Sequence, residues 1–226
     1  MRFLVFDIDG TLVDSQNLLV AAQEATFAAH GLPAPSREQV LSAVGLSLAE
    51  TFRVLAGPGG PHAALEATYR VTFQRLLAEP ALASPLFAGA DALVRDLAGR
   101  EDHLLGIATG KSQRGVRRLF DAHGWHTLFA SVQTADDAPS KPHPAMLEQA
   151  MGEVGAAPAE TVMIGDSTYD MQMARAAGCR AVGVGWGYCP VDALRDAGAQ
   201  VIVESIEGLA AVLAHADSTC PTGVEM

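Results

Sequence analysis

Short apolar runs, each of a length typical of a buried strand, recur along this 226-residue chain. They lie at residues 2–6, 103–109, 130–134, 161–165, 180–184 and 200–203. Between the later runs are stretches with helical periodicity, notably 112–123, 143–154 and 167–177. This alternation predicts an α/β fold, a Rossmann-like, doubly wound and mostly parallel sheet covered by helices. In such folds ligands bind at the carboxyl ends of the strands.

The stretch 15–83 breaks this alternation, because it contains helical patterns and no convincing strand. The patterns lie at 18–30, 37–43, 48–55 and 63–77, with prolines between them and at their exit. We therefore expect an α/β core formed by 1–14 and 84–226, with an inserted all-helical domain at 15–83. The insert would lie over the carboxyl end of the first strand. Residues 217–226 look like a frayed polar tail.

Composition excludes some classes of protein and leaves others open. A hydrophobic fraction of 49% with 18% charged residues indicates a folded globular chain. The formal net charge of -11 argues against nucleic acid as a partner. No apolar run approaches the ~20 residues needed to cross a membrane, and the N-terminal run is too short for a signal peptide. The three cysteines, Cys179, Cys189 and Cys220, form no CxxC pair, so we expect a cytoplasmic protein.

Asp7 and Asp9 directly follow the first apolar run, in the sequence Asp7-Ile8-Asp9-Gly10-Thr11. Two acids at the end of a buried strand are costly, because buried carboxylates must be paired, hydrogen bonded or bound to metal. A purely structural role for both is therefore improbable. Gly10 permits a turn, and Thr11 offers a hydroxyl group close by.

Polar residues also follow three later strands. Thr109 and Gly110 stand where a helix should begin, and free N–H groups there favour an anion, although Thr is equally common as an ordinary N-cap. Lys141 lies in a proline-rich loop after the third predicted strand, and alone it would be a solvated charge. Asp166 and Asp170 follow the fourth strand on the first turn of a helix, where together with Asp7 they favour a hard cation over capping.

These segments together resemble the four motifs of the haloacid dehalogenase-like hydrolase superfamily. The match comprises Asp7-x-Asp9-Gly10-Thr11, Thr109, Lys141, and Gly165-Asp166 with Asp170. It spans nearly the whole chain, and four motifs in register after successive strands are far more specific than any one alone. The helical insert resembles the small helical cap of the phosphoglycolate phosphatase and β-phosphoglucomutase branch.

The resemblance implies a role for each residue around one phosphoryl group. Asp7 would be the nucleophile that forms an aspartyl-phosphate, and Asp9 would be the general acid and base, oriented by Thr11. Thr109, the Gly110 N–H and Lys141 would bind the phosphoryl oxygens.

The same resemblance implies Mg²⁺ as the cofactor. Its ligands would be Asp7, Asp166 and the main-chain carbonyl of Asp9, with Asp170 in support. The ion would also screen the attacking carboxylate from the phosphate.

The substrate implied is a small phosphorylated metabolite, with phosphoglycolate ahead of sugar phosphates and pyrophosphate. A β-phosphoglucomutase-like phosphomutase would use the same core residues, and a pyrophosphatase is a further alternative. A non-catalytic binding or regulatory module on the same fold is a remote one. The sequence leaves the oligomeric state open between monomer and dimer.

Overall fold

The computed structural model describes residues 1–215, and its centre is a six-stranded parallel sheet in the order β3-β2-β1-β4-β5-β6. The strands are β1 (Arg2–Phe6), β2 (His103–Thr109), β3 (Ser131–Thr134), β4 (Thr161–Gly165), β5 (Arg180–Val184) and β6 (Val201–Val203). Every strand pair is parallel. The predicted doubly wound α/β fold is therefore confirmed, with each expected strand in its place.

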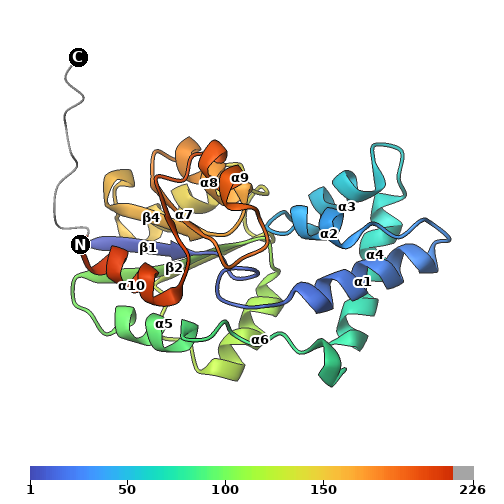
Figure 1. Ribbon diagram of the computed structural model, residues 1–226, viewed down its shortest axis with the longest axis horizontal. Coiled ribbons are helices and arrows are strands. Elements are labelled where there is room, and N and C mark those ends of the chain that lie inside the picture. The colour runs from blue at the N-terminus through green and yellow to red at the C-terminus, as the bar shows by residue number, and fades with distance from the viewer. Residues whose placement is uncertain (216–226) are drawn as a thin grey trace, which may run out of the picture.

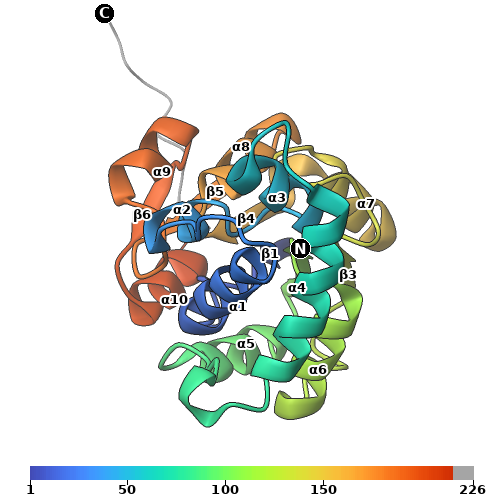
Figure 2. The same ribbon diagram turned by 90° about the vertical axis from the view of Figure 1, so that its right-hand side faces the viewer.

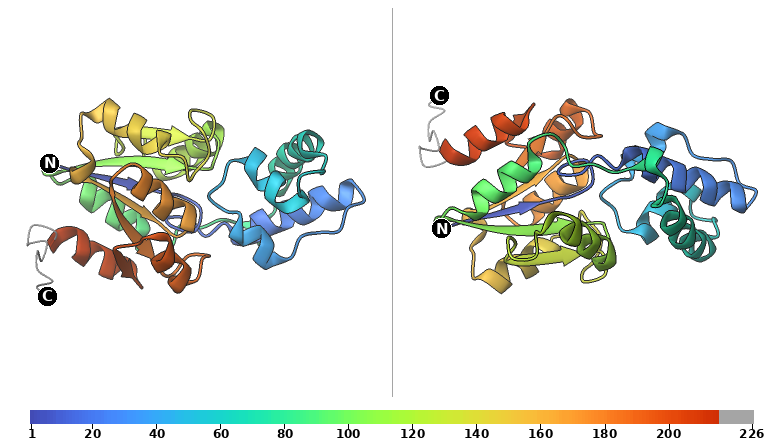
Figure 3. Two further views of the ribbon diagram at one scale, coloured as in Figure 1. Left: turned by 90° about the horizontal axis from the view of Figure 1, so that it is seen from above. Right: turned by 90° about the horizontal axis from the view of Figure 1, so that it is seen from below.

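Helices cover both faces of this sheet. One face carries α5 (Ala90–Ala98), α6 (Gln113–His123) and α10 (Ile206–His215), whose apolar side chains share one core cluster. The other carries α7 (Ala145–Val154), α8 (Thr168–Ala176) and α9 (Val191–Ala197), which share a second cluster. Figure 3 shows the sheet between these two layers. The helical patterns at 112–123, 143–154 and 167–177 correspond to α6, α7 and α8.

Strand β1 is apolar throughout because it is buried on both faces. Leu4 and Phe6 belong to the cluster beneath α5 and α10, whereas Phe3 and Val5 belong to the cluster beneath α7 and α8. The alternation follows from side chains that point to opposite faces along a strand. The central strand thus anchors both layers and holds its carboxyl end in a fixed position.

Between β1 and α5 the chain forms helices and no strand. These are α1 (Gln16–Ala29), α2 (Arg37–Ser42), α3 (Leu48–Ala56), α4 (His62–Leu76) and a 3₁₀ turn, η1 (Pro80–Leu82). Figures 1 and 2 show this helical group beyond the carboxyl end of β1, beside the sheet and not on either of its faces. It has small apolar clusters of its own, one of which centres on Phe27, Phe52 and Leu65.

The segment that leads into the helical group and the segment that leads out of it lie side by side. Val13 forms an antiparallel bridge with Leu86, the Phe87 N–H donates to the Leu12 carbonyl at 3.0 Å, and the Asp14 N–H donates to the Pro85 carbonyl at 2.8 Å. These contacts tie the two connecting segments together next to the end of β1.

Two expectations concern the limits of the chain. The predicted frayed tail at 217–226 lies outside the described residues. Within residues 1–215, no helix is both long enough and apolar enough to cross a bilayer.

Phe52 tests the importance of the small core inside the helical group. Its side chain is fully buried against Phe27 and Tyr69, so Phe52→Ala should lower the free energy of unfolding by about 3 to 5 kcal/mol. The matched control is Val54→Ala on the same helix, where the side chain is 55% exposed and the expected change is within about 0.5 kcal/mol. Urea unfolding followed by circular dichroism measures both. Equal effects of the two substitutions would contradict this packing.

Candidate active site

The site lies at the carboxyl ends of the central strands. Asp7 directly follows β1, and its N–H donates to the Ile164 carbonyl of β4 at 2.9 Å, which continues the pairing of the strands beyond the end of β1. Thr109 ends the neighbouring β2, and Asp166 directly follows β4. The strand order reverses at β1, which is where doubly wound sheets bind ligands.

Lys141 is the centre of a buried ion-pair network. Its Nζ lies 2.9 Å from Oδ1 of Asp7 and 2.6 Å from Oδ1 of Asp170, and the side chains of Lys141 and Asp170 are entirely buried. The other oxygen of Asp170 accepts from the Ser167 N–H at 3.1 Å and from the Ser167 hydroxyl at 2.6 Å. The loop lysine is therefore no solvated charge, because it joins the end of β1 to the first turn of α8 through two carboxylates.

Asp166 occupies a tight and fully buried position. Its Oδ1 accepts from the Thr11 hydroxyl at 3.1 Å, and its Oδ2 accepts from the Tyr188 N–H at 2.9 Å. Gly10 approaches this carboxylate so closely, at a φ of 87°, that a Cβ atom on residue 10 would collide with it. The turn after β1 therefore requires glycine at this position.

Thr11 bonds to an acid other than the one named in the sequence prediction. The sequence predicts that Thr11 orients Asp9, and in the structure its hydroxyl donates to Oδ1 of Asp166. The turn after β1, in which the Thr11 N–H donates back to the Ile8 carbonyl at 3.2 Å, brings the side chain to Asp166, which directly follows β4. Thr11 thus orients an acid from another motif.

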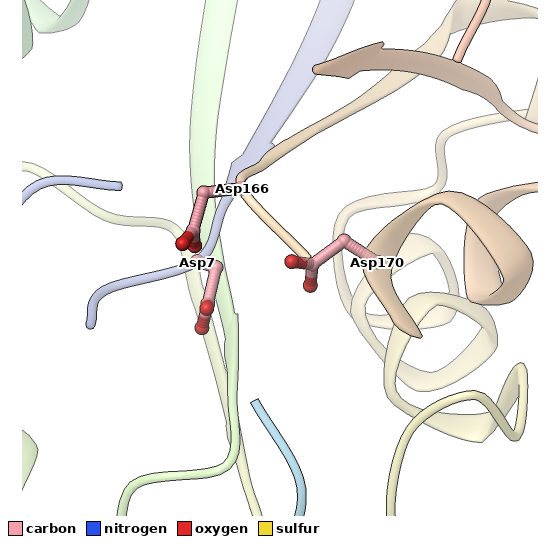
Figure 4. Close-up of side chains that lie close together, drawn as sticks. All are labelled: Asp7, Asp166 and Asp170. Atoms are coloured by element: carbon pink, nitrogen blue, oxygen red, sulfur yellow. The ribbon is translucent and has the colours of Figure 1, made fainter. Parts of the chain in front are cut away.

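The carboxylates of Asp7, Asp166 and Asp170 can together hold a metal ion. Each offers one oxygen, these oxygens all lie within 4.8 Å of one another, and Figure 4 shows the three groups close together. The buried Oδ2 of Asp7 has no hydrogen-bond partner among the described residues. Three carboxylates face one ammonium, so the cluster lacks positive charge. A hard, oxygen-binding divalent cation fits both the donor atoms and the charge.

Burial and mutual repulsion shift the pKa values of two carboxylates in this cluster. Burial raises the pKa of Asp7 to about 6, against the opposing effect of Lys141. Burial, followed by the nearby Asp7 and Asp170, raises the pKa of Asp166 well above its usual value. Burial lowers the pKa of Lys141, but Asp170 and Asp7 outweigh it and raise that pKa overall.

Asp9 has a different set of partners from Asp7. Its two oxygens lie 2.9 and 2.7 Å from Nζ of Lys111, and Oδ1 also accepts from the Ser15 hydroxyl at 2.7 Å. Its side chain is not part of the metal-binding group of carboxylates. Sequence reasoning overlooked Lys111 as a partner, although the residue stands two positions after Thr109, and it overlooked Ser15 as well.

Thr109 and Gly110 lie beneath the loop between α2 and α3. Thr109 is buried, and its hydroxyl accepts from the Lys111 N–H at 3.3 Å. A Cβ atom on Gly110 would collide with the main-chain oxygens of Gly45 and Leu46 in that loop. The helical group therefore closes directly over the end of β2.

Two aromatic residues after β5 form hydrogen bonds with the segment between β1 and α1. The Tyr188 hydroxyl accepts from the Ser15 N–H at 2.8 Å, and the Trp186 ring N–H donates to the Thr11 carbonyl at 3.1 Å. These bonds show that they hold the segment that carries Asp9.

A cleft of about 630 Å³ separates the helical group from the sheet domain, and this volume suits a small organic ligand. Asp9, Ser15, Gly110 and Lys111 line its inner end. Helices α1, α4 and α6 supply much of the remaining wall, which is mostly apolar on α1 and includes arginines on α4 and α6.

Comparison with known proteins gives consistent matches along nearly the whole chain. "Probable phosphatase IndB" of Dickeya dadantii is 35% identical over 208 residues, which cover 89% of each chain. A phosphoglycolate phosphatase of Pectobacterium atrosepticum is 31% identical over 222 residues, which cover 96% of this chain and 94% of the relative. The crystal structure of a hydrolase from Pseudomonas syringae superposes with a TM-score of 0.82 at 25% identity, covering 96% of this chain and 98% of that one.

The family comparison covers the part of the chain that contains all of these motifs. Residues 4–184 match the family described as haloacid dehalogenase-like hydrolase. This span runs from β1 to the end of β5 and includes the helical group. The chain belongs to the haloacid dehalogenase-like hydrolase family.

Proposed function

We propose that this protein is a Mg²⁺-dependent phosphatase that hydrolyses small phosphomonoesters through an aspartyl-phosphate on Asp7. The observation that carries the proposal is the environment of Asp7. One oxygen is fixed by Lys141 at 2.9 Å, and the other is buried without a hydrogen-bond partner among the described residues, beside two further carboxylates. A carboxylate in that setting is oriented and needs a cation. The relatives named as phosphatases support the same conclusion.

In the first step, an Asp7 oxygen forms a bond to phosphorus as the bond from phosphorus to the ester oxygen breaks. Asp9 gives a proton to that leaving oxygen, so that a neutral alcohol departs. Lys141 and Thr109 contact the oxygens of the transferring group and stabilise the charge on them. Lys141 would also hold Asp7 in line for attack.

In the second step, a water molecule replaces Asp7 at phosphorus. Asp9, now a carboxylate, takes a proton from that water, and the Asp7 carboxylate is restored as inorganic phosphate leaves. Ser15 and Lys111 fix the position of Asp9 in the structure, so its carboxylate cannot rotate freely.

Asp7, Asp166 and the main-chain carbonyl of Asp9 would hold Mg²⁺, with Asp170 in support. When bound, the ion would neutralise part of the phosphate charge and reduce its repulsion of the attacking carboxylate. Thr11 and the Tyr188 N–H keep Asp166 oriented for this role.

We assign residues 15–83 as a cap over a core of residues 1–14 and 84–226. The close approach of Gly110 to Gly45 and Leu46, and the hydrogen bond of 2.8 Å from the Ser47 N–H to the Ser140 hydroxyl, support a cap that closes over the carboxyl end of the sheet. The free thiols of Cys179 and Cys189 support the expected cytoplasmic location.

Metal binding should stabilise the fold. Mg²⁺ at a hundred times its Kd should raise the Tm by about 5 to 10 °C, because the ion binds the folded carboxylate cluster and not the unfolded chain. Asp166→Asn should remove most of this shift. Asp192→Asn, on an exposed side chain, should retain it. Differential scanning calorimetry at constant ionic strength makes the measurement, and an equal shift in the Asp166→Asn protein would contradict this metal site.

Turnover should require both acids of the first motif, to different degrees. Asp7→Asn should abolish detectable phosphate release, because an amide is no nucleophile here. Asp9→Asn should lower kcat by about 10²- to 10⁴-fold, the usual contribution of general acid–base catalysis. Steady-state phosphate release with Mg²⁺ measures both, with Asp192→Asn as the matched control. Full activity in Asp7→Asn would exclude the proposed nucleophile.

The substrate panel should separate the activities left open by the sequence. It should contain 2-phosphoglycolate, hexose phosphates, nucleotides and pyrophosphate, each with kcat/KM for phosphate release. Conversion of a hexose 1-phosphate into its 6-phosphate without phosphate release would favour a mutase. We expect hydrolysis of monoesters, with 2-phosphoglycolate among the substrates.

A further inference from the structure

One wall of the cleft is basic, although the chain as a whole carries a formal net charge of -11. Lys111, Arg114 and Arg118 all line the cleft. Lys111 precedes α6, and Arg114 and Arg118 lie four residues apart within it, which places the two arginines on one face of that helix. At a rise of 1.5 Å per residue the Cα atoms of the two arginines lie about 6 Å apart along the helix.

The acids of the cleft neutralise Lys111 but neither Arg114 nor Arg118. The three acidic residues that line the cleft are Asp9, Glu66 and Asp136. Asp9 pairs with Lys111, Glu66 lies 3.7 Å from Arg70, and Asp136 accepts from the Gln113 N–H at 2.9 Å. Each acid therefore already has a partner other than Arg114 or Arg118.

The two arginines are available for a ligand. Within residues 1–215, Arg114 forms no side-chain hydrogen bond or ion pair, and Arg118 forms only a hydrogen bond of 2.9 Å to Gln74 on α4. A guanidinium group with free donors binds a carboxylate or a phosphate strongly. Arg117 is a natural comparison, because it lies on the same helix but does not line the cleft.

The wall begins at the proposed reaction centre. Lys111 contacts Asp9, the proposed acid and base, and Arg114 and Arg118 continue along α6 away from it. A phosphomonoester with its phosphate at Asp7 would therefore extend its organic part past these side chains. A neutral organic part would leave the guanidinium groups without a partner, whereas a second anion would pair with them.

We propose that Arg114 and Arg118 bind a second anionic group of the substrate, so that the preferred substrates are phosphomonoesters that also carry a carboxylate or a second phosphate. This inference rests on the proposed phosphatase function and refines its substrate class. Arg114 and Arg118 are specificity-determining residues in this account, and they take no part in bond breaking.

The test compares substrate pairs that differ chiefly in the second anion. The carboxylate pair is 6-phosphogluconate against glucose 6-phosphate, and the phosphate pair is fructose 1,6-bisphosphate against fructose 6-phosphate. We expect kcat/KM to favour the doubly anionic member of at least one pair by about tenfold to a hundredfold, the usual effect of charge-assisted hydrogen bonds. The pair that shows the preference identifies the anion.

Variants of α6 then assign that preference to residues. The double variant Arg114→Gln/Arg118→Gln should bring the ratio of the two kcat/KM values close to one. Arg117→Gln should keep the wild-type ratio. Absence of preference in both pairs, or an unchanged ratio in the double variant, would overturn the inference.

A binding measurement separates this inference from the proposed function. Isothermal titration calorimetry with Asp7→Asn protein and the same four compounds gives affinities without turnover. Tighter binding of a doubly anionic compound, lost in the added Arg114→Gln/Arg118→Gln background, supports the inference even if the wild-type protein releases no phosphate. Equal affinities within both pairs, or no binding of any compound, would refute it, whereas absence of turnover alone refutes only the phosphatase.

Discussion

The buried contact of Lys141 with Asp7 and Asp170 is the interaction on which the rest of the site depends. Burying carboxylates in a protein is costly unless charge and hydrogen bonds compensate. Here the Lys141 ammonium forms ion pairs with both of these carboxylates. The Thr11 hydroxyl and the Tyr188 N–H donate hydrogen bonds to Asp166. The remaining negative charge is what makes the group suited to a divalent cation and, through it, to a phosphoryl group.

The sheet explains why residues so distant in sequence meet. Parallel strands end at one edge, so Asp7 after β1, Thr109 at the end of β2 and Asp166 after β4 are neighbours whatever lies between them. The helical group then covers this edge. Its α2–α3 loop comes so close to Gly110 at the end of β2 that there is no room for a Cβ atom. In the proposed mechanism the reaction takes place at the strand ends, and the cleft above them selects the substrate.

The sequence was sufficient for the fold and for which residues follow which strand, because apolar runs and polar strand ends are local patterns. It could not give the partners of those residues. Thr11 binds Asp166 and not Asp9, and Asp9 pairs with Lys111, 102 positions away. Such choices depend on turn geometry and side-chain conformation across the sheet edge. Likewise, the sequence around Arg118 predicts only an exposed helix residue, whereas in the structure its side chain donates to Gln74 on α4.

The identity of the phosphorylated residue tests the central claim most directly. Protein mixed with substrate and Mg²⁺, quenched in acid during turnover and analysed by peptide mass mapping should carry one phosphoryl group on Asp7. The Asp9→Asn protein should accumulate more of this aspartyl-phosphate wherever the substitution slows hydrolysis of the intermediate more than its formation. A phosphoryl group on another residue, or turnover in which Asp7 never carries one, would contradict the account.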